Sequence, residues 1–372
     1  MSVYENRRKK LYNWMAEEGI ALIMFEDIES RREPGIRWLT GQPGDALLFL
    51  SVEQHALLVP WDINLAMLFA DADMLIPYNE FERNSIKALR GAAESLKIPS
   101  GSKLEIPSVT PYPLFLQYVE AFTDFDIVCR NAGAHQEVGE LRAVKDEKEI
   151  EIYRHIATVT NGIIGLLEQH IRAGTLKTEE ETALFIESES RKQGCEGMGF
   201  ETLAAGPQRS FGIHTFPAYT GGDFAAQGLS ILDFGVRYAG YTGDVTLTFA
   251  RPPLTKAQER LITLTEKAYR LALNLIQNGM LTRTLGAAVD NLFKTAKKKM
   301  PHGLGHGIGL EAHEFPLFHN RTDNTWTFKP GMIFTLEPGL YDPIQGGCRL
   351  ENDILLTESG AEVLTNARII RL

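Results

Sequence analysis

Glycine alternates with other residues through a short segment that also carries three histidines. The run His302-Gly-Leu-Gly-His306-Gly-Ile-Gly-Leu-Glu-Ala-His313 holds three of the nine histidines of this 372-residue chain. Glycine at every second position denies the run a stable helix and lets the backbone come close to a ligand. Neutral imidazole suits first-row divalent metals, so one histidine can be a ligand while the others act on a substrate. The alternative is that each is an ordinary hydrogen-bonded loop residue.

Two aspartates lie inside apolar segments that have the length and composition of buried strands. Asp233 is part of residues 228–236, and Asp244 is part of residues 240–249. An acid surrounded by large apolar side chains is unusual at a solvated position, which favours a buried site. The alternative is that both aspartates are strand-end residues with local hydrogen bonds.

The short connection between these two strands predicts an antiparallel hairpin. With its tip at Tyr238 and Ala239, Asp233 and Asp244 are equally far from the turn and lie directly opposite each other. Directly opposed side chains have Cβ atoms about 4.5–5.5 Å apart. Two unpaired carboxylates at this separation repel each other, or one of them binds a proton. A divalent cation between them would remove the conflict.

Two glutamates further along the chain complete a set of metal-ligating side chains. Glu337 ends the strand predicted at 332–337, and Glu351 lies at the start of the strand predicted at 349–357. An oxygen-rich set with one imidazole suits Mn²⁺, our first choice, or Co²⁺, Zn²⁺ or Fe²⁺. Four carboxylates balance two divalent ions, and ions about 3.5–4 Å apart activate water and polarise a carbonyl. The sequence therefore predicts a two-metal hydrolytic site formed by Asp233, Asp244, His306, Glu337 and Glu351. Arg349 is expected to orient a carboxylate of the substrate.

Composition excludes several other classes of function. The formal charge is −10, and the basic runs Arg7-Arg8-Lys9-Lys10 and Lys297-Lys298-Lys299 fit solvated helix faces, so nucleic acid is not expected as a partner. The three cysteines are far apart in sequence, which argues against a disulfide framework and fits a reducing compartment. No run approaches the roughly 20 apolar residues of a membrane span, and the N-terminus lacks a signal-peptide core. We therefore expect a cytoplasmic protein with no membrane partner.

The length of the chain suits two domains of roughly 100–200 residues each. The first, residues 1–135, alternates helices and strands in the manner of a small α/β domain. Its predicted helices cover 6–18, 86–96 and 113–122, and its predicted strands cover 20–25, 46–51 and 56–59. The second, residues 136–372, has two roughly similar α+β halves. Its predicted helices cover 142–170, 178–193, 255–278 and 285–299.

Five motifs resemble those of the pita-bread-fold metallopeptidases that carry an added N-terminal domain. They are LDFG, GYTGDVTLTF, HGLGHGIGLEAHE, FTLEPGLY and RLEND, and a weaker likeness covers RWLTG and GDALL near the N-terminus. This branch includes X-Pro dipeptidases (prolidases), aminopeptidase P and creatinase. The resemblance implies an α+β fold, with a pita-bread catalytic domain preceded by a smaller α/β creatinase-type domain. It also implies a homodimer whose N-terminal domain contributes to the partner's pocket.

The resemblance also implies a role for each candidate side chain. Asp233 would bind one metal in bidentate fashion, Asp244 and Glu351 would bridge both metals, and His306 and Glu337 would complete the second. Glu337 would accept the proton of the bridging water, which becomes the metal-bridging hydroxide, and would shuttle that proton. The resemblance places further catalytic histidines around the substrate, where His214 and His313 hold it and its tetrahedral intermediate and His302 is close by. The implied activity is hydrolysis of the X-Pro bond of short proline-containing peptides.

Two positions depart from the pattern of these relatives. Prolidases often carry an arginine for the dipeptide's carboxylate where this chain has Leu317, and they often carry aspartate where this chain has Asn352. The first departure keeps open an amidohydrolase acting on a small non-peptide amide or amidine. A non-catalytic binding module is a third hypothesis. Creatinase-like chemistry without metals is disfavoured, because all five ligand positions are intact.

Overall fold

The computed structural model describes residues 2–372 and divides into two compact units, Met1–Arg142 and Ala143–Leu372. The boundary predicted at residue 135 falls inside helix α6 (Ala134–Leu141). This helix packs against α1 (Val3–Glu18) and α2 (Pro34–Thr40), and the first unit therefore ends after α6.

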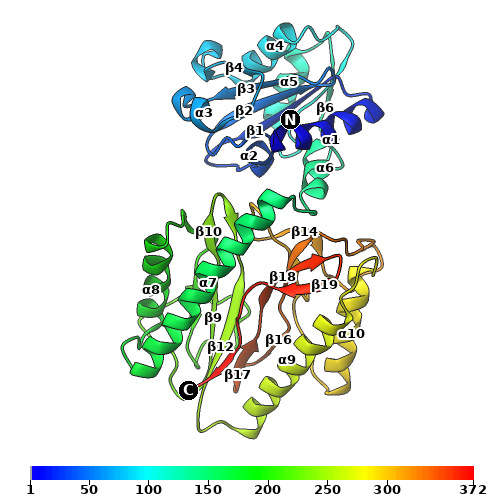
Figure 1. Cartoon of the computed structure of the whole chain (residues 1–372). Coiled ribbons are helices and arrows are strands. Elements are labelled where there is room, and N and C mark those ends of the chain that lie inside the picture. Colours follow the sequence, from blue (N-terminus) through cyan, green and yellow to red (C-terminus); the bar gives the residue numbers. More distant parts are fainter. Residues whose placement is uncertain (1) are drawn as a thin grey trace. The chain divides into compact units, whose positions relative to one another are not determined.

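The first unit is a six-stranded sheet with helices on both faces (Figure 1). The strand order is β4-β3-β2-β1-β5-β6, in which β1, β2 and β3 are antiparallel neighbours. The strands are β1 (Leu22–Asp27), β2 (Ala46–Ser51), β3 (Ala56–Pro60), β4 (Met74–Leu75), β5 (Lys103–Glu105) and β6 (Asp126–Val128). The remaining helices are α3 (Ile63–Phe69), α4 (Ser85–Ser95), α5 (Tyr112–Ala121) and the 3-10 turn η1 (Tyr78–Phe81). The three central strands are buried on both faces, which explains their nearly continuous apolar sequences. Every helix and strand predicted for residues 1–135 is present, with ends shifted by no more than three residues.

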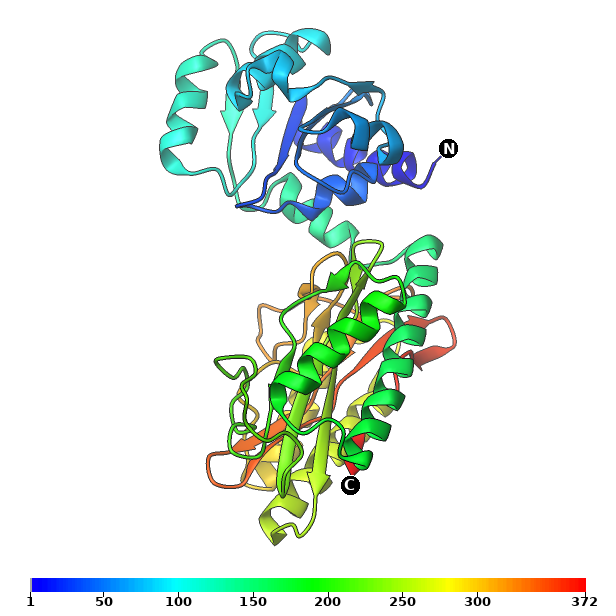
Figure 2. The same ribbon diagram turned by 90° about the vertical axis from the view of Figure 1, so that its left-hand side faces the viewer.

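The second unit has two α+β halves, as expected from the sequence. The helices are α7 (Glu147–Ala173), α8 (Glu179–Lys192), α9 (Lys256–Leu275) and α10 (Thr282–Thr295). The first-half strands are β7 (Gly197–Met198), β8 (Leu203–Ala205), β9 (Gly228–Phe234), β10 (Val236–Tyr238), β11 (Tyr241–Thr242) and β12 (Val245–Arg251). The later strands are β13 (His306–Gly307), β14 (Glu314–Leu317), β15 (Ile333–Leu336), β16 (Gly339–Asp342), β17 (Gly346–Arg349), β18 (Asn352–Thr357), β19 (Gly360–Val363) and β20 (Ile369–Arg371). The two main sheets have the orders β20-β12-β9-β8 and β14-β13-β15-β18-β19. Figures 1 and 2 show α7 and α8 packed along one side of these strands, with α9 and α10 on the other side of the unit.

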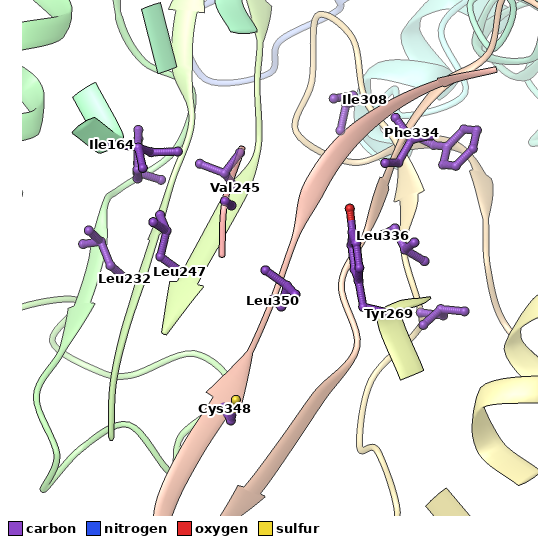
Figure 3. Packing of buried hydrophobic residues seen from close by; sticks show 14 of the residues in the cluster. Ile164, Leu232, Val245, Leu247, Tyr269, Ile308, Phe334, Leu336, Cys348 and Leu350 are labelled. Atoms are coloured by element: carbon purple, nitrogen blue, oxygen red, sulfur yellow. The ribbon is translucent and has the colours of Figure 1, made fainter. Parts of the chain in front are cut away.

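One core fills the space between these helices and the sheets. Figure 3 shows Ile164 of α7 beside Leu232 and Leu247 of β9 and β12, while Tyr269 of α9 lies near Leu336. These side chains are buried, so the strands that carry the candidate site have fixed positions. Among residues 2–372, none of the helices combines the length and apolar character that a membrane span requires. All three cysteines are free, as predicted.

The hairpin that carries the two aspartates has a different register from the predicted one. Its turn lies at Ala239 and Gly240, which have φ angles of 50° and 87°, as a tight type I′ turn requires. Asp233 therefore pairs with Thr246 in the ladder and is not directly opposite Asp244. The shift is two residues, so both aspartates stay on the same face of the sheet and become diagonal neighbours. Sequence reasoning missed this turn because it lacks an Asn-Gly pair.

Candidate metal centre and catalytic cavity

One cavity of the second unit brings together all nine side chains singled out in the sequence. Its volume is about 460 Å³. Those nine residues in its wall are His214, Asp233, Asp244, His302, His306, His313, Glu337, Arg349 and Glu351. They come from both halves of the unit, so the candidate site forms only when the two main sheets are assembled.

Short interruptions of the strands position the acidic side chains. Asp233 is the second-last residue of β9, and Asp244 directly precedes β12. Glu337 directly follows β15, and Glu351 lies in the two-residue gap between β17 and β18. The gap is held in place by an isolated antiparallel bridge between Glu351 and Thr246. Gly235 is needed beside Asp233's strand end, because a Cβ there would come within 1.9 Å of the Gly243 carbonyl oxygen.

Three of the predicted ligands form a compact buried cluster. One potential ligand atom from each of Asp244, His306 and Glu351 lies within 4.8 Å of the others. The His306 Nε2 atom is 3.7 Å from an oxygen of Asp244 and 3.7 Å from an oxygen of Glu337. Carboxylate oxygens and one imidazole nitrogen at these separations are the donors that oxygen-preferring divalent ions use.

A hydrogen bond to the backbone orients the imidazole of His306 so that its other ring nitrogen can bind a metal. Its Nδ1 atom donates to the carbonyl oxygen of Gly307 at 3.1 Å, which leaves Nε2 as the free acceptor facing the carboxylates. Burial, aided by the charge of His313, lowers the pKa of His306 to about 3. The ring is therefore neutral and able to bind a cation at neutral pH.

Without a cation, burial and mutual repulsion disfavour the charged forms of these carboxylates. Burial, together with the charge of Glu351, raises the pKa of Asp244 well above its usual value. Burial and the charge of Asp233 raise the pKa of Glu351 to about 7, and burial with the charge of Glu351 raises that of Glu337. The Oδ1 atom of Asp233 is buried and has no hydrogen-bond partner among the described residues. An unpaired buried acceptor beside crowded carboxylates fits a bound cation, so these residues suit the divalent metals predicted from the sequence.

Arg349 donates most of its N–H groups to other parts of the protein. Its guanidinium donates to Thr246 Oγ1 at 2.9 Å, to the Ile213 carbonyl at 3.0 Å, to the Tyr341 hydroxyl at 2.8 Å and to Asp233 Oδ2 at 2.6 Å. The side chain is buried. Four of its five N–H groups thus donate to protein acceptors, so the geometry supports Arg349 as a positioning residue for Asp233 more than as the expected partner of a substrate carboxylate.

His302 is held between two hydrogen bonds. Its Nδ1 atom donates to the Gly303 carbonyl at 2.7 Å, and its Nε2 atom lies 2.9 Å from the Tyr341 hydroxyl. Burial and the charge of Arg349 lower the pKa of His302 to about 4. A neutral His302 therefore forms one wall of the site, with Nδ1 3.6 Å from an oxygen of Glu337.

His214 and His313 lie at the open side of the cavity. Both side chains are solvent-exposed, although both line the cavity wall. The ring centroids of His313 and His306 are 4.1 Å apart. Partial burial against the cavity wall and the charge of His214 lower the pKa of His313, so the two imidazoles interact electrostatically. Their positions leave ring nitrogens accessible to a bound substrate.

Sequence reasoning missed three residues that support the ligands, of which Thr246 and Asp353 are buried and Tyr341 is partly buried. Thr246 Oγ1 donates to Glu351 at 2.7 Å, Tyr341 links Arg349 to His302, and Asp353 accepts from the Asp244 backbone N–H at 3.2 Å. Asp353 lies in an apolar strand, so the criterion that identified Asp233 would have found it. No sequence signal marks the other two, because Glu351 is 105 residues from Thr246 and His302 is 39 residues from Tyr341.

The two departures from the expected pattern have different locations. Leu317 lines the catalytic cavity and gives its wall an apolar side chain. Asn352 instead faces the C-terminal segment, where its side chain accepts from the Ala367 N–H at 2.7 Å and donates to the Ala367 carbonyl at 3.1 Å. Asn352 therefore holds the C-terminal segment at Ala367 by hydrogen bonds and is not among the residues of the cavity wall.

Comparisons with known proteins agree with this architecture. Residues 151–358 match the family model of metallopeptidase family M24. A Xaa-Pro dipeptidase of Pyrococcus horikoshii is 26% identical over 379 residues, covering 98% of each chain. A putative dipeptidase of Bacillus subtilis is 30% identical over 237 residues, covering 62% of this chain and 63% of the relative. The crystal structure of an X-Pro aminopeptidase from Thermotoga maritima superposes with a TM-score of 0.83 at 26% identity, covering 98% of this chain and 99% of the other. The predicted pita-bread fold class and its preceding domain are thereby confirmed.

Proposed function

This chain belongs to metallopeptidase family M24, and from that membership we propose that it hydrolyses the X-Pro bond of short peptides at a site for two divalent metal ions. The observation that carries the proposal is the buried cluster of Asp244, His306 and Glu351, with Glu337 beside it. Buried carboxylates that lack a cation destabilise a fold, so such a cluster indicates function. No observation on the described residues favours the amidohydrolase or the non-catalytic module.

Each ligand has a defined place in the proposed site. Asp233, Asp244, His306, Glu337 and Glu351 would hold the ions, of which Mn²⁺ is our first choice because the set is rich in oxygen. Bound divalent ions would polarise the scissile carbonyl and activate water for attack. Metal analysis of the protein as purified tests the identity of the ion.

The protein's own side chains supply the remaining chemistry. Glu337 is only partly buried, lines the cavity and has a raised pKa, so its carboxylate can accept a proton at neutral pH and pass it on. His214 and His313 at the open side can donate hydrogen bonds to the peptide carbonyl and to the oxyanion that forms from it. Leu317 and Ile213 offer apolar contacts for a proline ring.

A cleavage assay tests the proposal. The purified, Mn²⁺-loaded protein is incubated with X-Pro dipeptides, X-Pro-Y tripeptides and matched X-Ala peptides, and products are identified by mass spectrometry. We expect cleavage before proline only, and its loss in Asp244→Asn with the circular dichroism spectrum unchanged. Absence of turnover with both dipeptides and tripeptides would contradict the proposal.

The homodimer and the cytoplasmic location remain predictions, for which light scattering and cell fractionation are the measurements.

A further inference from the structure

A second cavity of the second unit carries a concentration of positive charge. Its volume is about 600 Å³, and its wall combines Gly286, Asp290 and Lys294 of α10 with residues 298–304 and 318–321. Lys294, Lys298, Lys299 and Arg321 line it, together with a single carboxylate, that of Asp290. We call it the cationic cavity. In a chain of net charge −10, such a group of cations is locally unusual.

The cationic cavity is a neighbour of the catalytic cavity. His302, Gly303 and His319 line both of them. The chain also leads from one to the other, because Leu317 lines the catalytic cavity and Arg321 lines the cationic one. A peptide that extends past the catalytic cavity along this segment would reach the cations.

The cations are available for a ligand to different degrees. Lys298 lies 3.5 Å from Asp342, and Arg321 lies 2.8 Å from Asp323. Neither Lys294 nor Lys299 has an ion-pair partner among residues 2–372, and both are exposed. Lys294 lies in the last turn of α10, where a cation is stabilised by the helix dipole. Lys299 and Arg321 lie outside α10, so the helix dipole does not explain their presence. The lysine run that sequence analysis assigned to a solvated helix face thus contributes two side chains to a cavity wall.

The catalytic cavity itself has no free cation for a carboxylate. Among the described residues of its wall, Arg349 is the only lysine or arginine, and each of its three guanidinium nitrogens already donates to a protein group. We infer that the cationic cavity binds a carboxylate carried by the part of a peptide substrate that lies beyond the scissile bond, and so favours peptides longer than X-Pro. This inference rests on the proposed function. The carboxylate is either the C-terminus of the peptide or an acidic side chain.

Three tetrapeptides with the same Ala-Pro start test the inference and distinguish the two sources. One is Ala-Pro-Ala-Ala with a free C-terminus, the second is amidated Ala-Pro-Ala-Glu, and the third is amidated Ala-Pro-Ala-Gln. We expect the wild-type, Mn²⁺-loaded protein to prefer one of the charged peptides over the neutral one about fivefold in kcat/KM, mainly through KM. The preferred peptide identifies the source of the carboxylate. Equal rates for all three would overturn the inference.

A matched pair of double variants assigns the preference to the cavity. Lys294→Ala with Lys299→Ala should abolish it and leave cleavage of the neutral peptide unchanged. Lys267→Ala with Lys297→Ala removes the same charge from exposed positions outside the cavity wall and should keep the preference. A loss of the preference in both double variants would contradict a specific site.

Direct binding separates this inference from the proposed function. If no X-Pro peptide is cleaved, the proposed function fails, and calorimetry then judges the cavity with the fragment Pro-Ala-Ala as free acid and as amide. About fivefold tighter binding of the acid, lost in Lys294→Ala with Lys299→Ala, would support the cationic cavity. Equal affinity for acid and amide would overturn it.

Discussion

At the scale of single residues, the site depends on which hydrogen bonds each carboxylate accepts and on how much of its negative charge stays unpaired. Thr246 donates to Glu351 and accepts from Arg349, and Arg349 in turn donates to Asp233. One oxygen of Asp233 has no protein partner among the described residues. The hydrogen bonds therefore fix the orientation of the carboxylates and leave charge for a cation to neutralise.

Glu351→Gln should make the metal-free protein more stable than wild type as pH rises. Burial and the charge of Asp233 raise the pKa of Glu351 from 4.5 to about 7. Between these values the folded state binds more protons than the unfolded state, so the free energy of unfolding of wild type falls as pH rises. Glutamine mimics the protonated acid and lacks this loss. Thermal unfolding with chelator from pH 4.5 to 7 should show a growing advantage of the variant, and Mn²⁺ should reverse the order. A constant difference across this range would contradict the account.

Arg349→Lys should damage the site although it keeps the charge. Lysine cannot replace four donors that point in fixed directions, so partners such as the buried Thr246 hydroxyl and the Ile213 carbonyl lose their hydrogen bonds. We expect the free energy of unfolding to fall by about 2 kcal/mol, and kcat/KM to fall at least about tenfold, which corresponds to 1.4 kcal/mol.

Arg154→Lys is the matched control for that variant. Arg154 forms an exposed ion pair with Glu362 at 2.6 Å, and such pairs contribute less than about 1 kcal/mol. Denaturant unfolding and peptide assays of both variants provide the comparison. Equal effects at the two positions would show that Arg349 has no special role.

At the scale of elements, the β10–β11 turn determines where Asp244 lies relative to Asp233. The turn residues Ala239 and Gly240 both have positive φ angles. Gly240→Ala should destabilise the protein by about 1 kcal/mol, because an alanine in left-handed backbone is strained. Ala239→Gly relieves the same strain and should leave stability unchanged or slightly higher. Unfolding curves of the two variants check the register, and equal destabilisation by both would contradict it.

Local sequence signals predicted most helices and strands, but they predicted neither the register of the hairpin nor all the contacts between segments. Apolar segments and helical spacing located β2 at the predicted residues and α4 within one residue. The hairpin register was wrong by two residues because a positive φ at Ala239 has no clear mark in the sequence. All nine predicted side chains nevertheless line one cavity, because a two-residue shift keeps a side chain on its face of the sheet. Tyr341 was missed because its contact with His302 joins segments 39 residues apart in the chain.

At the scale of the whole molecule, the catalytic cavity lies entirely within Ala143–Leu372. The match to the metallopeptidase family covers residues 151–358 of the same unit. The predicted role of the first unit, which is to assist a partner's pocket in a homodimer, belongs to an assembly of two chains. Activity of the second unit would then depend on protein concentration in the full chain, which a dilution series measures.

We propose that five side chains hold the two divalent ions that the peptidase reaction needs. Metal-free protein is titrated with Mn²⁺ while bound metal per chain and cleavage of an X-Pro peptide are measured on the same samples. We expect no cleavage without metal and maximal cleavage at two bound ions per chain. In Asp244→Asn we expect both the binding of two ions and the cleavage to be lost. Full activity in excess chelator, or a maximum at one bound ion, would contradict it.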